Sequence, residues 1–387
     1  MIHLLPSADY EVYLGANHAH EEEVLIEPTN RLLKMYESLG LRTTLFCDVA
    51  CIWRYREWGR EETASRMERQ MIDAVSRGHD VQAHLHPHWL RTDLIAGGYV
   101  FPPEDYLLGT LDTDETRCQT IVEHLLQRVV AYLHRLLQPV DPEYRCIAFR
   151  AGGYGLQPRE NMVIAALIKA GFVIDSSIIP GFVYHSGTHR VDFSATPNRA
   201  NYWLNAEHGL AQPAPDGEGL FEIPIPAIAL PPLQALWVNL PEALRQTVTI
   251  LTGQDRTDTP RGIPCGEPPP QPASRWHRAY WRGLALLHTR FHRLEAGLNL
   301  HLLQTTWKRY LHRFPAHGQE IYLALNCHPK GMQHRHFNVL KQFHQQAARH
   351  SPHPMVCLTF RDAWRQLREG EGSLHKKLLK EKRGLGD

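Results

Sequence analysis

The sequence lacks the features of a disulfide-bonded, membrane-spanning or nucleic-acid-binding protein. Its seven cysteines are scattered along 387 residues without a Cys-x-x-Cys pair. This favours reduced thiols and a cytoplasmic protein over a disulfide scaffold. No apolar run is long enough to span a bilayer, and the first residues turn acidic too soon for a signal peptide. A formal net charge of +1 gives no reason to expect a nucleic-acid partner.

Short apolar strands alternate with amphipathic helices over most of the chain. A chain of this length exceeds one average domain, but it also fits a single barrel with an insertion. The β-α-β-α-β order predicts an α/β protein with a parallel sheet or barrel. Strands are expected at residues 2–5, 42–49, 80–85, 145–150, 172–177, 220–228, 321–326 and 355–360, and the intervening helices at 27–39, 62–77, 113–137 and 158–170.

The alternation stops between residues 231 and 318. Residues 253–273 are rich in proline, glycine and charge, which predicts a flexible linker, and aromatic and His-rich helices are expected over 274–314. We interpret the whole stretch as a helical insertion, dispensable for the barrel but important for substrate choice. The predicted division is a barrel formed by residues 1–230 and 319–370, an insertion at 231–318, and a basic tail at 371–387.

Residues 78–89 read Gly-His-Asp-Val-Gln-Ala-His-Leu-His-Pro-His-Trp. Alternating apolar residues predict a strand, and Pro87 ends it because proline lacks a backbone donor. Ligands gather at the carboxyl ends of strands in α/β proteins, and imidazole is a common zinc ligand. His84 and His88 are therefore the candidate metal ligands, whereas His86 is expected to pack or hydrogen-bond. The alternative is a His-rich surface turn.

Other polar residues follow the predicted strands, and in a parallel barrel they would line one rim. Two histidines and a carboxylate can hold a divalent ion while leaving positions open for water and substrate. A second carboxylate can then act as general base and a free imidazole as general acid. These residue types predict metal-assisted hydrolysis of an amide or ester. The set is Asp9, Glu11, Asp48, His84, His88, Arg150, Asp175 and His328.

The same residues resemble the polysaccharide deacetylases, the NodB-homology group also called carbohydrate esterase family 4. The strongest match runs from Gly78 to His88 and is similar to the family stretch Gly-His-Glu-Ile-Gly-Asn-His-Thr-x-x-His. The resemblance covers residues 1–230 and 319–365. Its first motif departs from the family, which has adjacent aspartates where this chain has Asp9 and Glu11. Further similar segments are Thr44-Leu45-Phe46, Phe149-Arg150-Ala151-Gly152-Gly153-Tyr154-Gly155, Asp175-Ser176-Ser177 and Leu323-Ala324-Leu325-Asn326-Cys327-His328-Pro329.

The resemblance implies a distorted, seven-stranded (β/α) barrel and an enzyme of carbohydrate metabolism that acts on carbon–nitrogen bonds. The expected reaction removes an acyl group, N-acetyl in the first instance, from an amino-sugar or polysaccharide precursor. The expected cofactor is a divalent ion, zinc first, with cobalt, nickel or manganese as alternatives. The implied roles are Asp9 as base and His328 as acid, Arg150 and Asp175 as supporting catalytic residues, and Glu11, His84 and His88 as metal ligands.

Four residues are expected to bind substrate: Asp48, Gly153, Tyr154 and Trp89. Some candidates also have structural explanations, because Trp89 fits a buried aromatic position and Asp48 fits a turn cap. Arg150 could equally form a structural ion pair with Asp175. Two other functions stay open: a small-amide hydrolase of the allantoinase kind, and a barrel that binds saccharide or metal without catalysis because its first motif has changed.

Overall fold

The protein is described here by a computed structural model. The structure describes residues 1–12, 21–95, 98–187, 189–253, 274–316 and 319–369. Residues 254–273 of the expected linker and the basic tail predicted at 371–387 lie outside the described residues.

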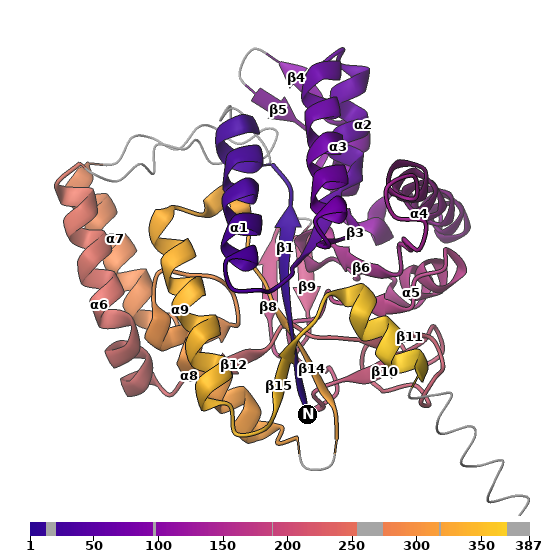
Figure 1. Ribbon diagram of the computed structural model, residues 1–387. Coiled ribbons are helices and arrows are strands. Elements are labelled where there is room, and N and C mark those ends of the chain that lie inside the picture. Colours follow the sequence, from indigo (N-terminus) through magenta and orange to yellow (C-terminus); the bar gives the residue numbers. More distant parts are fainter. Residues whose placement is uncertain (13–20, 96–97, 188, 254–273, 317–318, 370–387) are drawn as a thin grey trace, which may run out of the picture.

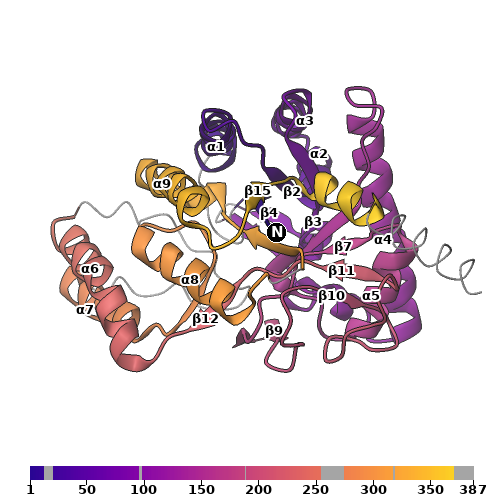
Figure 2. The same ribbon diagram turned by 60° about the horizontal axis from the view of Figure 1, so that its bottom comes forward.

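A nine-stranded sheet forms the centre of the molecule and curls into an incomplete barrel (Figures 1 and 2). All neighbouring strands are parallel except β10 and β11. The predicted α/β fold with a curved parallel sheet is confirmed, but the sheet has nine strands instead of seven. The strand order is β10 (Tyr202–Leu204), β11 (Leu220–Glu222), β7 (Ile174–Asp175), β6 (Ala148–Ala151), β3 (Asp80–Leu85), β2 (Thr44–Asp48), β1 (Ile2–Tyr10) and β14 (Ile321–Leu325), with β15 (Met355–Cys357) also paired to β1.

The side chain of Asn201 joins the β11 side and the β14 side of the barrel, whose described strands are not paired with each other. Among the described residues, no ladder connects β11 to β14. The Asn201 amide bridges this gap. Its Nδ2 donates to the carbonyl oxygens of Glu222 (3.2 Å) and Tyr322 (2.8 Å), and its Oδ1 accepts from the Tyr322 N–H (2.8 Å). On the side of β14 that faces away from β1, the buried N–H and carbonyl groups of Tyr322 are thereby hydrogen-bonded although no described strand pairs with β14 there.

Amphipathic helices cover the outside of the sheet (Figure 1). In α4, for example, Val122, Leu126, Val129 and Leu133 recur every three to four residues and are fully buried, as expected of an amphipathic helix. None of the described helices is long and apolar enough to cross a membrane. The covering helices are α1 (Glu27–Glu37), α2 (Val49–Glu57), α3 (Glu61–Ser76), α4 (Glu115–Leu137), α5 (Glu160–Lys169) and α9 (His334–His350).

Shorter elements connect the strands and helices. The described residues form three two-stranded antiparallel sheets: β4 (Asp93–Ile95) with β5 (Gly98–Val100), β8 (Val183–Ser186) with β9 (His189–Asp192), and β12 (Ala227–Ala229) with β13 (Phe291–Arg293). The single-turn helices are η1 (Glu22–Ile26), η2 (Pro87–Arg91), η3 (Pro103–Asp105), η4 (Leu108–Thr110), η5 (Gly152–Tyr154) and η6 (Pro329–Gly331).

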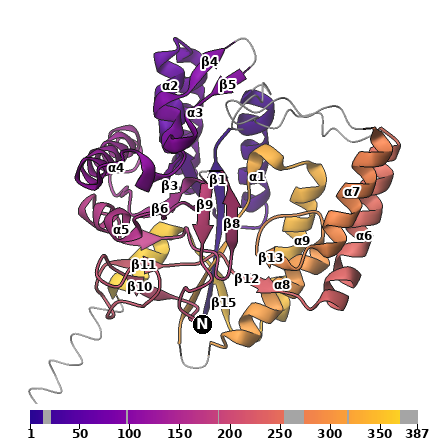
Figure 3. The ribbon, with the colours of Figure 1, turned by 180° about the vertical axis from the view of Figure 1, so that it is seen from behind.

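The stretch expected to be a separable insertion divides into two parts. Helices α6 (Pro232–Leu251) and α7 (Arg275–His288) form a hairpin at the edge of the molecule (Figure 3). By contrast, β13 and α8 (Leu300–Arg313) belong to the barrel, because β13 pairs with β12 and the α8 side chains of Trp307 and Tyr310 are buried in the common core. The packing therefore separates the peripheral part near residue 289, whereas the sequence suggested 318. The two boundaries differ because the chain leaves the barrel after β12, forms α6 and α7, and returns to the core with β13 and α8.

A buried histidine of α9 predicts how stability depends on pH. Burial lowers the pKa of His344 to about 3, and its Nε2 lies 3.3 Å from the Tyr36 hydroxyl. The unfolded chain takes up this proton near pH 6.5, so the free energy of unfolding falls as pH drops from there to about 3. The loss is at most about 1.4 kcal/mol per pH unit. Urea unfolding at about pH 7 and about pH 5 should show wild type losing up to about 2 kcal/mol more than His344→Gln. Equal losses would contradict this assignment.

Candidate functional site

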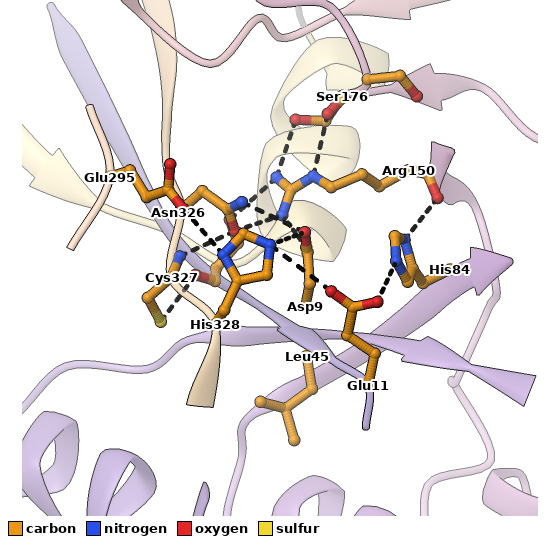
Figure 4. A network of polar contacts seen from close by, with 12 residues as sticks. Asp9, Glu11, Leu45, His84, Arg150, Ser176, Glu295, Asn326, Cys327 and His328 are labelled. Carbon is orange, nitrogen blue, oxygen red and sulfur yellow. Dashed lines mark hydrogen bonds and ion pairs between the residues drawn. The ribbon is translucent and has the colours of Figure 1, made fainter. Parts of the chain in front are cut away.

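The carboxyl ends of four neighbouring strands build one pocket, as the sequence predicted for a parallel barrel. Asp9 and Glu11 come from the end of β1, His84 and His86 from β3, the backbone after Arg150 from β6, and His328 from the turn after β14. Figure 4 shows the side chains of Asp9, Glu11, His84 and His328 converging. The pocket has a volume of about 110 Å³ and is lined by Asp9, Glu11, His84, His86, Tyr106, Ala151, Gly153, Tyr154, His328 and Lys330.

Arg150 holds Asp9 in place from beneath the pocket. The fully buried guanidinium lies 2.7 Å from Asp9 Oδ1 and donates to Ser7 Oγ (3.0 Å) and to the Ser176 carbonyl oxygen (3.0 Å). Burial alone would raise the pKa of Asp9, but the Arg150 charge and the hydrogen bond with His328 hold that pKa well below its usual range. Asp9 is therefore an oriented carboxylate whose second oxygen, Oδ2, faces His328.

His328 lies between two carboxylates. Its Nε2 is 3.2 Å from Asp9 Oδ2, and its Nδ1 is 2.8 Å from Glu295 Oε1. Glu295 is itself held by Arg293, at 2.6 Å. Burial opposes protonation of the imidazole, but the hydrogen bonds with Asp9 and Glu295 raise the pKa of His328 to about 10. The ring is thus held by a carboxylate at each nitrogen and is in the positively charged, doubly protonated form at neutral pH. Its Nε2 is directed into the pocket (Figure 4).

Glu11 forms a second cluster with His84 and His86 on the other side of the pocket. Glu11 Oε2 lies 2.6 Å from His86 Nε2 and 3.7 Å from His84 Nε2, and Glu11 Oε1 lies 2.8 Å from Lys330 Nζ. Burial would raise the pKa of Glu11, but Lys330 and the two imidazoles hold it well below its usual range. Three buried ligand atoms therefore face one another within 4.8 Å.

The chemistry of this cluster fits a divalent ion. His84 Nδ1 lies 2.8 Å from the Arg150 carbonyl oxygen, which places a hydrogen on Nδ1 and turns Nε2 toward Glu11. His84 Nε2 is buried without a hydrogen-bond partner in the described residues. Buried polar atoms are rarely left in this state unless something binds them. Two imidazoles and a carboxylate form a three-ligand set of the kind that keeps positions open for substrate.

His86, and not His88, lies in the cluster with Glu11 and His84. His88 is fully buried, stacks on Tyr106 with the ring centroids 5.6 Å apart, and belongs to neither of the ligand groups found among the described residues. The reason is local geometry. His84 and His86 are two residues apart in extended backbone and point to the same side. The turn η2 begins at Pro87 and carries His88 away into the aromatic packing.

Five predicted site residues do not line the pocket: His88 and Arg150, described above, and Trp89, Asp48 and Asp175. Trp89 is fully buried against Tyr55 and Tyr99, so it has no face open to a sugar ring. Asp48 is buried and its Oδ1 accepts the backbone N–H of His86 at 3.2 Å, so it orients a ligand instead of binding substrate. Asp175 accepts from the Ser177 hydroxyl (2.8 Å), which in turn accepts the Ala151 N–H (2.8 Å). Asp175 thus supports the pocket wall, and Arg150 pairs with Asp9 instead.

Gly153 and Tyr154 do line the pocket, as predicted. Gly153 has a φ of +59°, and a Cβ there would come within 2.8 Å of the Tyr106 ring, so the turn needs glycine. A Cβ on the preceding Gly152 would meet the His86 ring at 2.6 Å. The glycine-rich turn therefore lets the backbone approach both the pocket and its histidines.

Sequence reasoning missed three residues that shape the site. Glu295 lay in the stretch interpreted as an insertion, where only the alternation of Phe291, Arg293 and Glu295 hinted at a strand. Lys330 follows His328 by two residues, in the single-turn helix η6, and this closeness in sequence was the available signal. Tyr106 lies in an irregular segment that offered no signal at all.

Comparisons with known proteins were made on sequence and on structure. The sequence matches no protein-family model, and no curated protein matches it. The structure is similar to a protein described as a polysaccharide deacetylase from Mycobacterium smegmatis (TM-score 0.43, 12% identity, covering 95% of this chain and 91% of that one). It is also similar to the Puue allantoinase (0.42, 13%, covering 93% and 88%). A third similar structure is described as a polysaccharide deacetylase from Pseudomonas aeruginosa PAO1 (0.40, 13%, covering 93% and 89%).

Proposed function

We propose that the protein is a metal-dependent hydrolase that removes an acyl group, N-acetyl in the first instance, from an amino-sugar or oligosaccharide. The observation that carries the proposal is the juxtaposition of two units in one pocket. One unit is the Asp9–His328 pair, 3.2 Å apart, and the other is the buried cluster of Glu11, His84 and His86. A base, an acid and a three-ligand set are the groups that amide hydrolysis requires.

Each unit has a distinct part in the proposed reaction. A divalent ion held by Glu11, His84 and His86, zinc in the first instance, would act as a Lewis acid toward the substrate carbonyl. Asp9 Oδ2 takes a proton from the water that attacks the carbonyl carbon. His328 Nε2 gives its proton to the nitrogen as the carbon–nitrogen bond breaks, which yields a carboxylate and a free amine. Arg150 keeps Asp9 ionised and oriented throughout.

The size of the pocket favours a small acyl group attached to a larger substrate. Its volume of about 110 Å³ is well below the roughly 300–1,000 Å³ of sites that enclose a drug-sized ligand. An acetyl group can enter while the sugar stays at the mouth. There Tyr154 lies under the guanidinium of Arg293, and Tyr106 packs on His189. Aromatic rings at the mouth are suited to contact a sugar face.

Acetate release from acetylated substrates, measured beside the loss of allantoin, tests the proposal on the protein loaded with zinc, cobalt, nickel or manganese. The panel contains N-acetylated amino sugars and their oligomers, together with allantoin and simple acetamides. Release of acetate and a free amine from the amino sugars is the expected result. Turnover of allantoin alone would assign the site to small cyclic amides. Saccharide binding without turnover under any metal would point to the non-catalytic alternative and contradict the proposal.

Glu295 is expected to be a positioning residue for His328. Glu295→Gln keeps the size of the side chain but removes the charge that fixes His328 Nδ1, so kcat should fall by about tenfold or more while KM changes little. Glu295→Asp, which keeps the charge, should recover part of the loss. The control is Glu320→Gln, where a carboxylate faces the imidazole of His3 far from the pocket. Equal activity of wild type and Glu295→Gln would show that Glu295 only packs.

A further inference from the structure

The α6–α7 hairpin exposes an unusual amount of apolar surface. Half of the large apolar side chains that are exposed in the described part of the chain belong to these two helices. The hairpin stands at the edge of the molecule beside α8 and α9, on the side away from α4 and α5 (Figures 1 and 3). Trp237, Trp276 and Trp281 are exposed by 72%, 75% and 54%, whereas the tryptophans of the barrel are buried or partly buried. A surface of this kind marks an interaction site.

The apolar residues of α6 lie along one stripe. Leu233, Trp237, Leu244 and Val248 follow one another at helical spacing and all face outward. The opposite face of the helix is buried through Ala235 and Ala243, which pack toward the rest of the molecule. The stripe is therefore a continuous outer face that the described residues of this chain do not cover.

Helix α7 combines aromatic side chains with positive charge. Its exposed apolar residues are Trp276, Tyr280 and Trp281, and its sequence Arg-Trp-His-Arg-Ala-Tyr-Trp-Arg-Gly-Leu-Ala-Leu-Leu-His contains no acidic residue. The two helices together carry four arginines and one glutamate, although the whole chain has a formal net charge of only +1. Positive charge is thus concentrated on the same hairpin as the exposed tryptophans.

We propose that the α6–α7 hairpin binds the surface of an anionic lipid bilayer, with the tryptophans entering the interface and the arginines contacting lipid head groups. Tryptophan and tyrosine prefer the membrane–water interface because they have an apolar body and a polar edge. Amphipathic helices with aromatic residues and a basic polar face lie in that interface. Each arginine near an anionic surface adds to the attraction.

The composition of α6 argues against a second copy of the chain as the occupant. An apolar stripe on a helix could pack against another helix, but such a seam needs a straight, regular surface. Pro241 lies inside α6, where it removes a backbone donor and interrupts the regular pattern of the helix surface. The arginines of α7 would also be brought together in a symmetric dimer. A fluid, negatively charged surface accommodates both features.

Vesicle sedimentation with the full chain tests the proposal. Wild type is expected to sediment with vesicles of phosphatidylcholine and phosphatidylglycerol, and much less with phosphatidylcholine alone or at high salt. Trp237→Ala and Trp276→Ala should each weaken binding by about tenfold, because each removes a large apolar side chain from the interface. Arg275→Glu should weaken binding to the mixed vesicles by roughly tenfold or more, because it reverses one charge.

The matched control is Ile121→Ala, an exposed apolar residue on α4 at the other side of the barrel, which should bind like wild type. A second measurement needs no variant: the tryptophan emission of wild type should shift to shorter wavelength with mixed vesicles. Absence of sedimentation or of the shift would overturn the proposal. So would equal binding by all variants, or a dimer in solution that Trp237→Ala dissociates. All these outcomes are independent of acetate release.

Discussion

His328→Gln is expected to fold and to bind metal as wild type does, but to lower kcat by about two to four orders of magnitude. The reason is that, in the proposed mechanism, His328 Nε2, 3.2 Å from Asp9 Oδ2, supplies the proton that the departing nitrogen needs. Glutamine preserves the bulk of the ring without an ionisable group. The measurement is kcat on the substrate found by acetate release, together with the melting temperature and metal content of the same preparation.

The control for this variant is His312→Gln, which replaces an exposed histidine of α8 and should leave kcat unchanged. If His328 had only a packing role, its loss would lower the melting temperature and leave kcat per folded molecule intact. That result would remove the general acid from the proposed mechanism and favour a barrel that binds without catalysis.

Metal content should distinguish the three histidines of the β3 turn. His84→Ala and His86→Ala each leave two ligands of the three, so affinity for zinc should fall by roughly 100-fold or more. His88→Ala should retain the ion, because His88 packs among aromatic rings outside the ligand group. Elemental analysis after dialysis against metal-free buffer measures the difference, and kcat should follow metal content in all three variants.

Loss of the ion from His88→Ala but not from His86→Ala would restore the pair expected from the sequence motif. Equal metal content in wild type and all three variants would end the idea of a metal site here. His88→Ala creates a cavity and is expected to lose stability, so each preparation needs a melting temperature beside its metal content.

Strand alternation and strand ends made most of the fold and half of the site predictable. Asp9 and Glu11 were placed on one face because they are two residues apart at the end of an apolar strand, and both line the pocket. Arg150 and His328 were placed at the same rim because each follows a buried strand. These inferences needed only periodicity and the rule that parallel strands end together.

The errors arose where position depends on tertiary packing. The same two-residue alternation that placed Asp9 and Glu11 on one face also places His84 and His86 together. His88 was expected instead because it stands where the family motif has its second histidine. Trp89 was expected to bind substrate, whereas the turn that carries it packs into the core. Glu295 lies 286 residues after Asp9, just beyond β13, and that strand is recognisable only from its pairing with β12. Periodicity does not reveal which distant segments meet.

Arg150 serves the fold and the chemistry with one side chain. It ties the end of β1 to the segments that follow β7 and β14 through Ser7, Ser176 and Asn326, and its guanidinium lies 4.1 Å from the centre of the Phe46 ring. The Arg150 side chain, which orients Asp9, therefore also holds the segments of the barrel together. A substitution of Arg150 is expected to lower both the amount of folded protein in the cell and its turnover, so a screen for either property would identify this residue. A substitution of His328 would be identified only by a screen for turnover.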